Sequence, residues 1–407
     1  MTDGRTFDVA VVGGGPSGLT AASRAAWAGA HTILLDRMAE PGQKIVLSGG
    51  GRCNVLPMSI DPTAYVTDSS ANSLRKIVRS WPLDELRAFL ERDVGLRLRD
   101  EPETGKVFPA SGGGRAVLDR LLALVRRAGV QLRTNCSIRA LDSGAPHRLR
   151  TEDGGEIRAR RVVFATGGLS YPETGSDGHG LQIARSLGHE IVEPYPALVA
   201  LHCDPSPHRS LAGLSLHAAL TIGVGARRVR SSGGFLFTHR GYSGPAVLNA
   251  GHVAARAHRD GQSLPITVSW SDRTPDEWLE RLAPGRRTVR SVLRDVVADR
   301  LVVHLLNALG LLDAKTATLT RQDRRRLIVM LTAYPLPWET PGGFGEAEVT
   351  GGGVHLSGVD PKTLESRIVP GVHFCGEMLD AFGPIGGTNF LWAFVTGKVA
   401  GDGAARG

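Results

Sequence analysis

The segment Val9-Ala10-Val11-Val12-Gly13-Gly14-Gly15-Pro16-Ser17-Gly18 decides the fold of this 407-residue chain. It begins with a short apolar run, and its glycines at 13, 15 and 18 have the G-x-G-x-x-G spacing of a dinucleotide-binding turn. A helix-like stretch follows from Leu19 to Ala28, and a second apolar run, Thr32 to Leu35, ends at Asp36. This order predicts a strand–helix–strand unit that holds a dinucleotide.

Each part of the motif has a physical reason. Gly13 permits the tight turn, Gly15 lets the backbone approach a pyrophosphate, and Gly18 lets helix and strand pack closely. The helix N-terminus faces the phosphates, and Asp36 can accept hydrogen bonds from a ribose hydroxyl. The residues expected at the cofactor in this unit are Gly13, Gly15, Pro16, Ser17, Gly18, Asp36 and Arg37.

Length and composition narrow the class of protein. A chain of 407 residues can bury a sizeable core and is expected to hold two or three domains. No apolar run reaches membrane-spanning length and no signal pattern opens the chain, so we expect a soluble cytoplasmic protein that does not contact a membrane. The cysteines, Cys53, Cys136, Cys203 and Cys375, are widely spaced and predict neither zinc nor another metal site.

The formal net charge of +8 raises the question of a nucleic-acid partner. Only 6 of the 48 basic residues are lysines, and this even arginine bias is typical of genome composition rather than of a binding patch. The densest run, residues 321–326, is more typical of a solvated helix face. We therefore disfavour nucleic acid as a partner and expect a small-molecule substrate, although the charge can attract acidic ligands.

The rest of the chain suggests a split nucleotide-binding domain. Helices are predicted at 83–90 and 114–128, and the apolar run 161–165 enters Thr166-Gly167-Gly168. Strand-like runs at 198–202, 216–222 and 265–270 indicate a β-rich insert, and Thr274 with Glu277 forms a capping box that opens a helical region to about Thr332. A last strand at 372–375 precedes a helix that reaches about Ala400.

We therefore predict an α/β fold with a Rossmann-like domain built from the N- and C-terminal segments. Its expected bounds are 1–188 and 340–407. The inserted β-rich substrate domain is expected at 189–273, and a small helical subdomain at 274–339.

Several motifs together resemble a known family. They are Gly13 to Gly18, Ser48 to Asn54, Ala165 to Gly168 with Ser170-Tyr171-Pro172, residues 349–354, Gly376-Glu377 with Leu379-Asp380, and Gly386-Gly387 with Asn389. In this order they look like bacterial FAD flavoproteins described as aminoacetone-oxidase-like, which also include flavin reductases acting on bile-acid intermediates. The resemblance implies bound FAD, a β-rich insert and a small helical subdomain. Thr388 and Leu391 depart from the family's usual Tyr and Gln.

The remaining motifs predict the flavin site. Glu377 is placed like an acid that binds the ribityl chain, and the helix that opens at 386–389 can face the flavin pyrimidine edge. Further cofactor contacts are expected at Lys44, Ser48, Gly50, Gly51, Arg52, Cys53, Asn54, Thr166, Gly167, Gly168, Gly376, Glu377, Gly386, Gly387, Thr388, Asn389 and Phe390. The catalytic candidates are Arg52, Asn54, Thr388 and Asn389. No partner cysteine accompanies Cys53, which favours a structural role over a redox one.

These features favour an FAD-dependent oxidoreductase that transfers a hydride between flavin and a small organic substrate, such as an amine or aminoketone oxidised with oxygen as acceptor. An alternative is an NAD(P)H-dependent reductase of an unsaturated or carbonyl substrate. Only one dinucleotide motif is visible, so NAD(P)H would act as a transient reductant. A second alternative is non-enzymatic: a flavin redox sensor or a nucleic-acid-binding flavoprotein.

Overall fold

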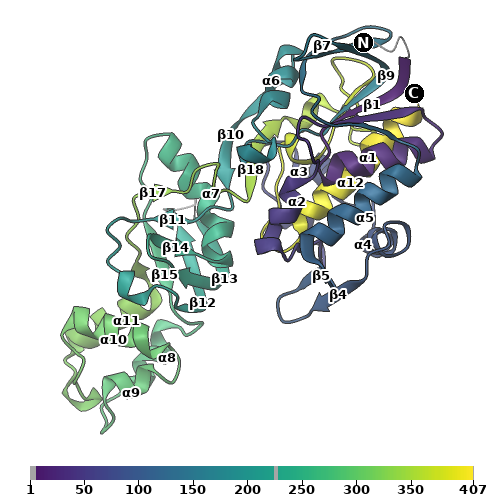
Figure 1. The fold of residues 1–407 in the computed structure, drawn as a ribbon. Coiled ribbons are helices and arrows are strands. Elements are labelled where there is room, and N and C mark those ends of the chain that lie inside the picture. The colour runs from purple at the N-terminus through teal and green to yellow at the C-terminus, as the bar shows by residue number, and fades with distance from the viewer. Residues whose placement is uncertain (1–5, 224–227, 407) are drawn as a thin grey trace. The chain divides into compact units, whose positions relative to one another are not determined.

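The computed structural model describes residues 6–223 and 228–406, and the chain divides into two compact units. Unit 1 contains the chain up to Pro196 and from Glu348 onward, and unit 2 is Ala197–Ala347. Figure 1 shows the elements of both units. The insert was expected at 189–339 with a division at 273, whereas β10 (Ile191–Ala197) belongs mainly to unit 1 and the strands and helices that follow it, up to Ala347, lie together in unit 2.

Unit 1 is built on a seven-stranded sheet whose central strands are parallel. The parallel strands run in the order β6-β2-β1-β9-β19, and β8 and β7 continue the sheet antiparallel from the first half of β9. Their bounds are β1 Thr6–Val12, β2 Thr32–Leu35, β6 Gln131–Arg133, β7 Ile138–Asp142, β8 His147–Thr151, β9 Glu156–Phe164 and β19 Val372–Phe374. Parallel strands are buried on both faces, which explains the continuous apolar runs of the sequence.

The first and last helices of the chain pack directly against each other. Helix α1 (Pro16–Trp27) and helix α12 (Thr388–Arg406) lie side by side in Figure 1. A Cβ atom at Gly397 would overlap the Ser17 carbonyl oxygen, and one at Gly401 would overlap that of Ala21. These two glycines therefore let the helix backbones touch, and the predicted domain built from both chain segments is confirmed.

Other elements surround this core. Helix α5 (Gly113–Arg127) buries the predicted stripe that includes Val117, Leu121 and Val125. The remaining elements of unit 1 include α2 Gln43–Leu47, α3 Ala71–Val78, α4 Leu83–Ala88, α6 His179–Ser186, the small antiparallel sheet of β3 Leu56–Pro57, β5 Lys106–Pro109 and β4 Leu98–Glu101, and the pair β10 Ile191–Ala197 and β18 Val349–Val354.

Unit 2 is an antiparallel sheet with helices packed on it. The strand order is β16-β15-β12-β13-β14-β11-β17. The bounds are β11 Leu201–His202, β12 Ser215–Ile222, β13 Val229–Phe237, β14 Gly241–Ser243, β15 Ile266–Ser269, β16 Tyr334–Pro335 and β17 Thr340–Pro341. The strand predicted at 198–202 shortens to 201–202 because Leu198 takes a left-handed backbone, with φ 54°.

The helices of unit 2 contain one that the sequence analysis missed. Helix α7 (Pro245–Arg259) packs on β12 and β13 inside the expected β-rich stretch 189–273, where no helix was predicted. The predicted capping box is present, since the side chain of Thr274 accepts from Glu277 N at 3.3 Å at the start of α8. The helices that follow the box are α8 Pro275–Arg281, α9 Val289–Leu293, α10 Asp299–Leu309 and α11 Arg321–Thr332. They share one apolar core with the sheet.

Candidate functional site

The glycine turn after β1 is held by close backbone packing at two of its three positions. A Cβ atom at Gly13 would overlap the Ala165 carbonyl oxygen, and one at Gly18 would overlap that of Gly13. Gly13 also needs its left-handed backbone, with φ 103°. In contrast, no atom lies within 4 Å of a Cβ built on Gly15. Packing within the protein therefore requires Gly13 and Gly18, and leaves open space above Gly15.

The N-terminus of α1 presents free backbone donors beside this open space. Gly15 is the N-cap residue, no side chain caps the helix, and Pro16 occupies the first turn, where it lacks an N–H. The first N–H groups of a helix have no partner within the helix, and its dipole favours an anion there. An open, uncapped helix start of this kind fits a pyrophosphate.

Asp36, at the end of β2, supports the turn from the other side. Its Oδ2 accepts a hydrogen bond from Gly14 N at 2.6 Å and its Oδ1 accepts one from Met38 N at 2.8 Å. Burial raises the pKa of the Asp36 carboxyl above its usual range, and these two backbone bonds act against that rise. Asp36 therefore holds the turn, and its expected bond to a ribose hydroxyl stays a prediction. The neighbouring Arg37 forms an ion pair with Asp177.

A polar network joins the two ends of the chain at the C-terminal edge of the sheet. Lys44 Nζ donates to Glu377 Oε2 at 2.6 Å and also to the Ser170 hydroxyl. Glu377 Oε1 accepts from Ser170 Oγ at 2.7 Å and from Thr350 N at 2.8 Å. Burial alone would raise the pKa of Glu377, but the Lys44 charge and these bonds outweigh it and hold the pKa below its usual range. Glu377 is therefore a half-buried anion beside a half-buried cation.

The loops after β9 pack tightly around this network. A Cβ atom at Gly168 would overlap the Thr350 hydroxyl, and one at Gly376, where φ is 74°, would overlap Ser17 Oγ. Thr166 Oγ1 donates to Met378 Sδ at 3.0 Å. Gly167 takes φ 76°. The predicted residues of these loops are thus gathered beside the start of α1.

The loop at 48–54 has an unusual backbone that the glycines permit. Gly49, Gly50 and Gly51 have φ of 57°, 64° and 85°, and no atom lies within 4 Å of a Cβ built on Gly50. Cys53 is fully buried, and desolvation raises the pKa of its thiol to about 11, with Ser48 acting against the rise. A thiol with this pKa is protonated near neutral pH, which supports the structural role expected for it.

The two catalytic candidates of this loop have different surroundings. The Arg52 guanidinium forms an ion pair with Glu101 and lies 4.1 Å from the centre of the Phe108 ring, so it is held by the small β3-β5-β4 sheet. The Asn54 Oδ1 atom is buried and has no hydrogen-bond partner in the described part of the chain. A Cβ atom at Gly387 would lie 2.8 Å from that oxygen. Asn54 therefore offers a free acceptor near the start of α12.

The start of α12 is organised by hydrogen bonds between side chains and the backbone that the sequence did not reveal. Asn389 Oδ1 accepts from Gly383 N at 2.8 Å, and its Nδ2 donates to Gly383 O at 2.9 Å. The Thr388 hydroxyl donates to the Pro384 carbonyl, and Tyr65 OH donates to Thr388 O at 2.9 Å. In the structure Thr388 and Asn389 thus shape the 383–387 loop, and their expected catalytic role stays a prediction. Phe390 is half-buried and lies 6.0 Å from the Phe394 ring centre.

Sequence reasoning missed three members of the site. Ser170 and Thr350 lay in quoted motifs but received no role, and they turn out to bind Glu377. Tyr65 carried no sequence signal, because its partner, the Thr388 carbonyl, lies 323 positions further along the chain.

Taken together, the residues fit a flavin dinucleotide. The uncapped α1 start and the open Gly15 suit the pyrophosphate, and the free positions at Gly50 and Gly386 leave room for a ligand near α12. Within the described residues, no group of His, Cys, Asp and Glu side chains is placed to hold a metal ion. No helix among them is both long and apolar enough to cross a membrane.

Comparison with known proteins gives matches over nearly the whole chain. Residues 7–403 match the model of the HI0933-like protein Rossmann domain. A 3-dehydro-bile acid delta(4,6)-reductase of Clostridium scindens is 29% identical over 416 aligned positions, which cover 98% of this chain and 99% of that protein. A ribosomal RNA dihydrouridine synthase of Escherichia coli is 28% identical over 397 positions, with 95% of each chain covered.

Among solved structures, a 3-ketosteroid delta1-dehydrogenase of Sterolibacterium denitrificans superposes with a TM-score of 0.53. The two chains are 15% identical, and the match covers 98% of this chain and 99% of the other. This likeness concerns the fold alone. The site geometry and the sequence relatives support FAD as the cofactor and oxidoreductase chemistry.

Proposed function

Because this chain belongs to the HI0933-like family of Rossmann-domain, FAD-dependent oxidoreductases, we propose that it reduces a carbon–carbon double bond conjugated to a carbonyl. The favoured substrate is the uracil ring of uridine in RNA.

The whole-chain similarity to a bile acid reductase and to a dihydrouridine synthase supports the reaction type. A 3-oxo steroid with double bonds at positions 4 and 6 is a conjugated enone, and dihydrouridine is uridine saturated at C5–C6, next to the C4 carbonyl. Both names thus describe addition of two hydrogens across a double bond that a carbonyl activates. The amine or aminoketone oxidation favoured by the sequence has no counterpart in these two names.

The distribution of charge favours RNA over a steroid. Unit 2 contains 19 lysine and arginine residues and 12 aspartate and glutamate residues, a net charge of +7. The rest of the chain contains 29 and 28, a net charge of +1. Unit 2 therefore carries almost all of the +8, which an even arginine bias does not explain. A basic domain is the electrostatic signature of nucleic-acid binding.

The reaction needs a hydride at the carbon β to the carbonyl and a proton at the α carbon. Bound FAD, once reduced by the hydride of NAD(P)H, would supply the hydride, and water would supply the proton. The α1 N-terminus and Gly15 would bind the pyrophosphate. The Lys44–Glu377 pair would fix the floor of the site, and the free Asn54 acceptor would orient a ring N–H.

The proposal is tested with ribosomal RNA from a host strain that lacks this protein. The RNA is incubated with FAD-loaded protein and NADH or NADPH, digested to nucleosides and analysed by mass spectrometry. We expect a uridine two hydrogens heavier to accumulate with time. A matched reaction replaces the RNA with a conjugated steroid enone, and another offers aminoacetone with oxygen. Turnover of either small molecule without any change in the RNA would overturn the proposed substrate.

A further inference from the structure

The antiparallel sheet of unit 2 has two unlike faces. Side chains alternate along its strands, so one face gathers Ala218, Leu220, Phe235 and Val268, each at most 1% exposed. The apolar side of α7 packs in the same core. The opposite face carries the polar side chains His217, Thr221, Arg230, Ser232, Thr267 and Ser269.

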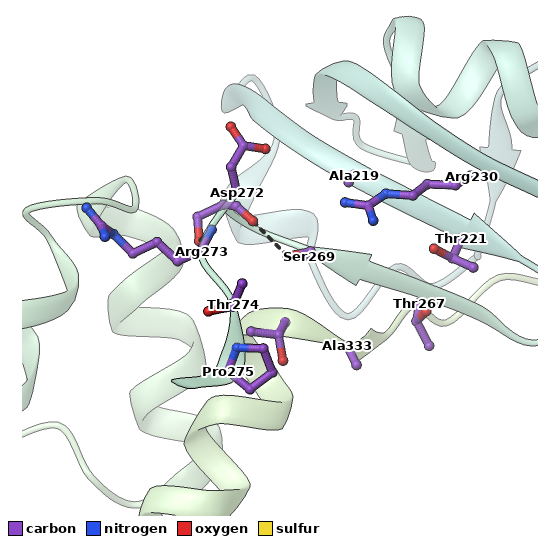
Figure 2. A pocket seen from close by; sticks show the side chains of 12 residues that line it. Ala219, Thr221, Arg230, Thr267, Ser269, Asp272, Arg273, Thr274, Pro275 and Ala333 are labelled. Carbon is purple, nitrogen blue, oxygen red and sulfur yellow. Dashed lines mark hydrogen bonds between the residues drawn. The ribbon is translucent and has the colours of Figure 1, made fainter. Parts of the chain in front are cut away.

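This polar face borders a pocket of about 380 Å³ that lies within unit 2. Figure 2 shows Arg230 lying over the strands, with the threonines of β12 and β15 beside it. The lining residues are Ala219, Thr221, Arg230, Thr267, Ser269, Ser271, Asp272, Arg273, Thr274, Pro275, Thr332 and Ala333. None of these side chains is large and apolar, so the pocket does not suit a steroid or a lipid chain.

Two arginines at this pocket have guanidinium donors that no described residue accepts. Arg230 is exposed and makes no ion pair or hydrogen bond with any described residue. The Arg273 Nε atom is buried and also has no partner among the described residues. Other arginines of unit 2 are paired, for example Arg287 with Asp295 at 2.9 Å and Arg290 with Asp299 at 2.7 Å. One acid, the exposed Asp272, also lines the pocket.

We propose that this pocket and its polar sheet face form a binding surface for the phosphodiester backbone of an RNA, in which Arg230 contacts a phosphate. The inference rests on the proposed function and extends it, because it assigns a part of the insert to holding the substrate. Arginine suits the task since its planar guanidinium matches phosphate geometry, and serine and threonine hydroxyls are common donors to phosphate and sugar. Such contacts position an RNA without reading its sequence.

The test measures RNA binding by the full-length, FAD-loaded protein. The probe is a fluorescently labelled RNA hairpin with uridines in its loop, titrated by anisotropy at several salt concentrations. Arg230→Glu is expected to weaken binding by about tenfold or more, because a charge-assisted hydrogen bond is lost and a repulsion is added. The slope of affinity against salt should fall by about 1. Asp272→Asn, which removes the acid of the same pocket, is expected to tighten binding.

Arg259→Glu is the matched control, because Arg259 lies on α7, pairs with Asp260 and belongs to the opposite side of the sheet. It is expected to leave affinity close to that of the wild type. Equal affinities for wild type and Arg230→Glu would overturn the inference, as would equal losses in Arg230→Glu and Arg259→Glu. Loss confined to Arg230→Glu, with no uridine reduced in ribosomal RNA, would sink the proposed reaction and leave the binding surface standing.

Discussion

Exchanging two glycines of one motif for alanine should separate folding from cofactor binding. Gly15 and Gly18 lie three residues apart, but a Cβ at Gly18 would overlap the Gly13 carbonyl oxygen, whereas one at Gly15 meets no atom within 4 Å. Gly15 also has an ordinary extended backbone, with φ −74° and ψ −177°. A side chain at Gly15 would therefore occupy only the space expected for the pyrophosphate.

The magnitudes follow from these surroundings. Gly15→Ala loses a favourable N-cap residue but gains about 0.4–1 kcal/mol by restricting the unfolded chain, so its net effect on stability is within about 1 kcal/mol. For a unit of this size that shifts Tm by no more than about 3 °C. Gly18→Ala forces two backbone segments apart and is expected to cost roughly 3 kcal/mol. Gly15→Ala should nevertheless weaken FAD by at least about tenfold, because phosphate hydrogen bonds of about 1.5–3 kcal/mol are disturbed.

The assay measures the melting temperature of both apoproteins. It also measures how tightly each binds FAD, from the quenching of flavin fluorescence during a titration. We expect Gly15→Ala to melt like the wild type and bind poorly, and Gly18→Ala to fail in both measurements. Full FAD affinity in Gly15→Ala, or equal destabilisation of the two variants, would refute this assignment of the turn.

Three further predictions concern ionisable groups that are wholly or partly buried. Glu377→Gln should lower the free energy of unfolding by roughly 3 kcal/mol, which urea unfolding measures. This value is the lower end of the range for a broken buried ion pair, because Lys44 is still about 25% exposed. The pKa of Glu377 is depressed in the folded protein. Its contribution to stability is therefore complete above the ordinary glutamate pKa and is lost as the pH falls from that value through the depressed pKa. Burial, with His304 nearby, lowers the pKa of His208 to about 4, so stability should fall by roughly 3 kcal/mol as the pH drops from 6.5 toward 4, and His208→Gln should flatten that profile. Cys53→Ser should keep most of the rate of flavin reduction in rapid mixing, because its pKa of about 11 leaves no thiolate.

Each of these has its own control. A Lys44→Met/Glu377→Gln double variant should recover part of the lost stability, and no recovery would mean that the two side chains do not act as a pair. His208 bridges Tyr242 OH and Tyr334 OH, each at 2.7 Å, so a Tyr334→Phe variant tests loss of a bond without loss of the histidine. A pH profile unchanged by His208→Gln would assign the acid sensitivity elsewhere. Loss of activity in Cys53→Ser with FAD retained would restore the thiol mechanism.

Local signals made much of the fold predictable. The glycine spacing at 13–18 and the Thr274–Glu277 box each act within one turn of chain, and both form as expected. Helix α7 was missed because only strand-like runs were singled out in 189–273, although proline at its first position, Pro245, is favoured in the first turn of a helix.

Partners distant in the sequence limited the prediction of the site. The sequence marked Lys44 and Glu377 separately, but their ion pair joins residues 333 positions apart. Asn389 was expected to contact ligand, yet its amide is bound on both sides by Gly383. The +8 was weighed over the whole chain, and dividing it at the bounds of the two units shows that +7 of it belongs to unit 2.

The most direct test of the proposed reaction is the reoxidation of reduced protein without oxygen. The FAD-loaded protein is reduced anaerobically with a small excess of dithionite, the excess is removed, and the visible flavin absorbance is followed after mixing with ribosomal RNA from the strain lacking this protein. The account predicts that oxidised flavin returns, with one uridine reduced for each flavin, and that the same RNA already modified leaves the flavin reduced. The account would be contradicted by two results together. The flavin would stay reduced with the unmodified RNA and reoxidise with oxygen alone, and an amine would reduce the oxidised protein.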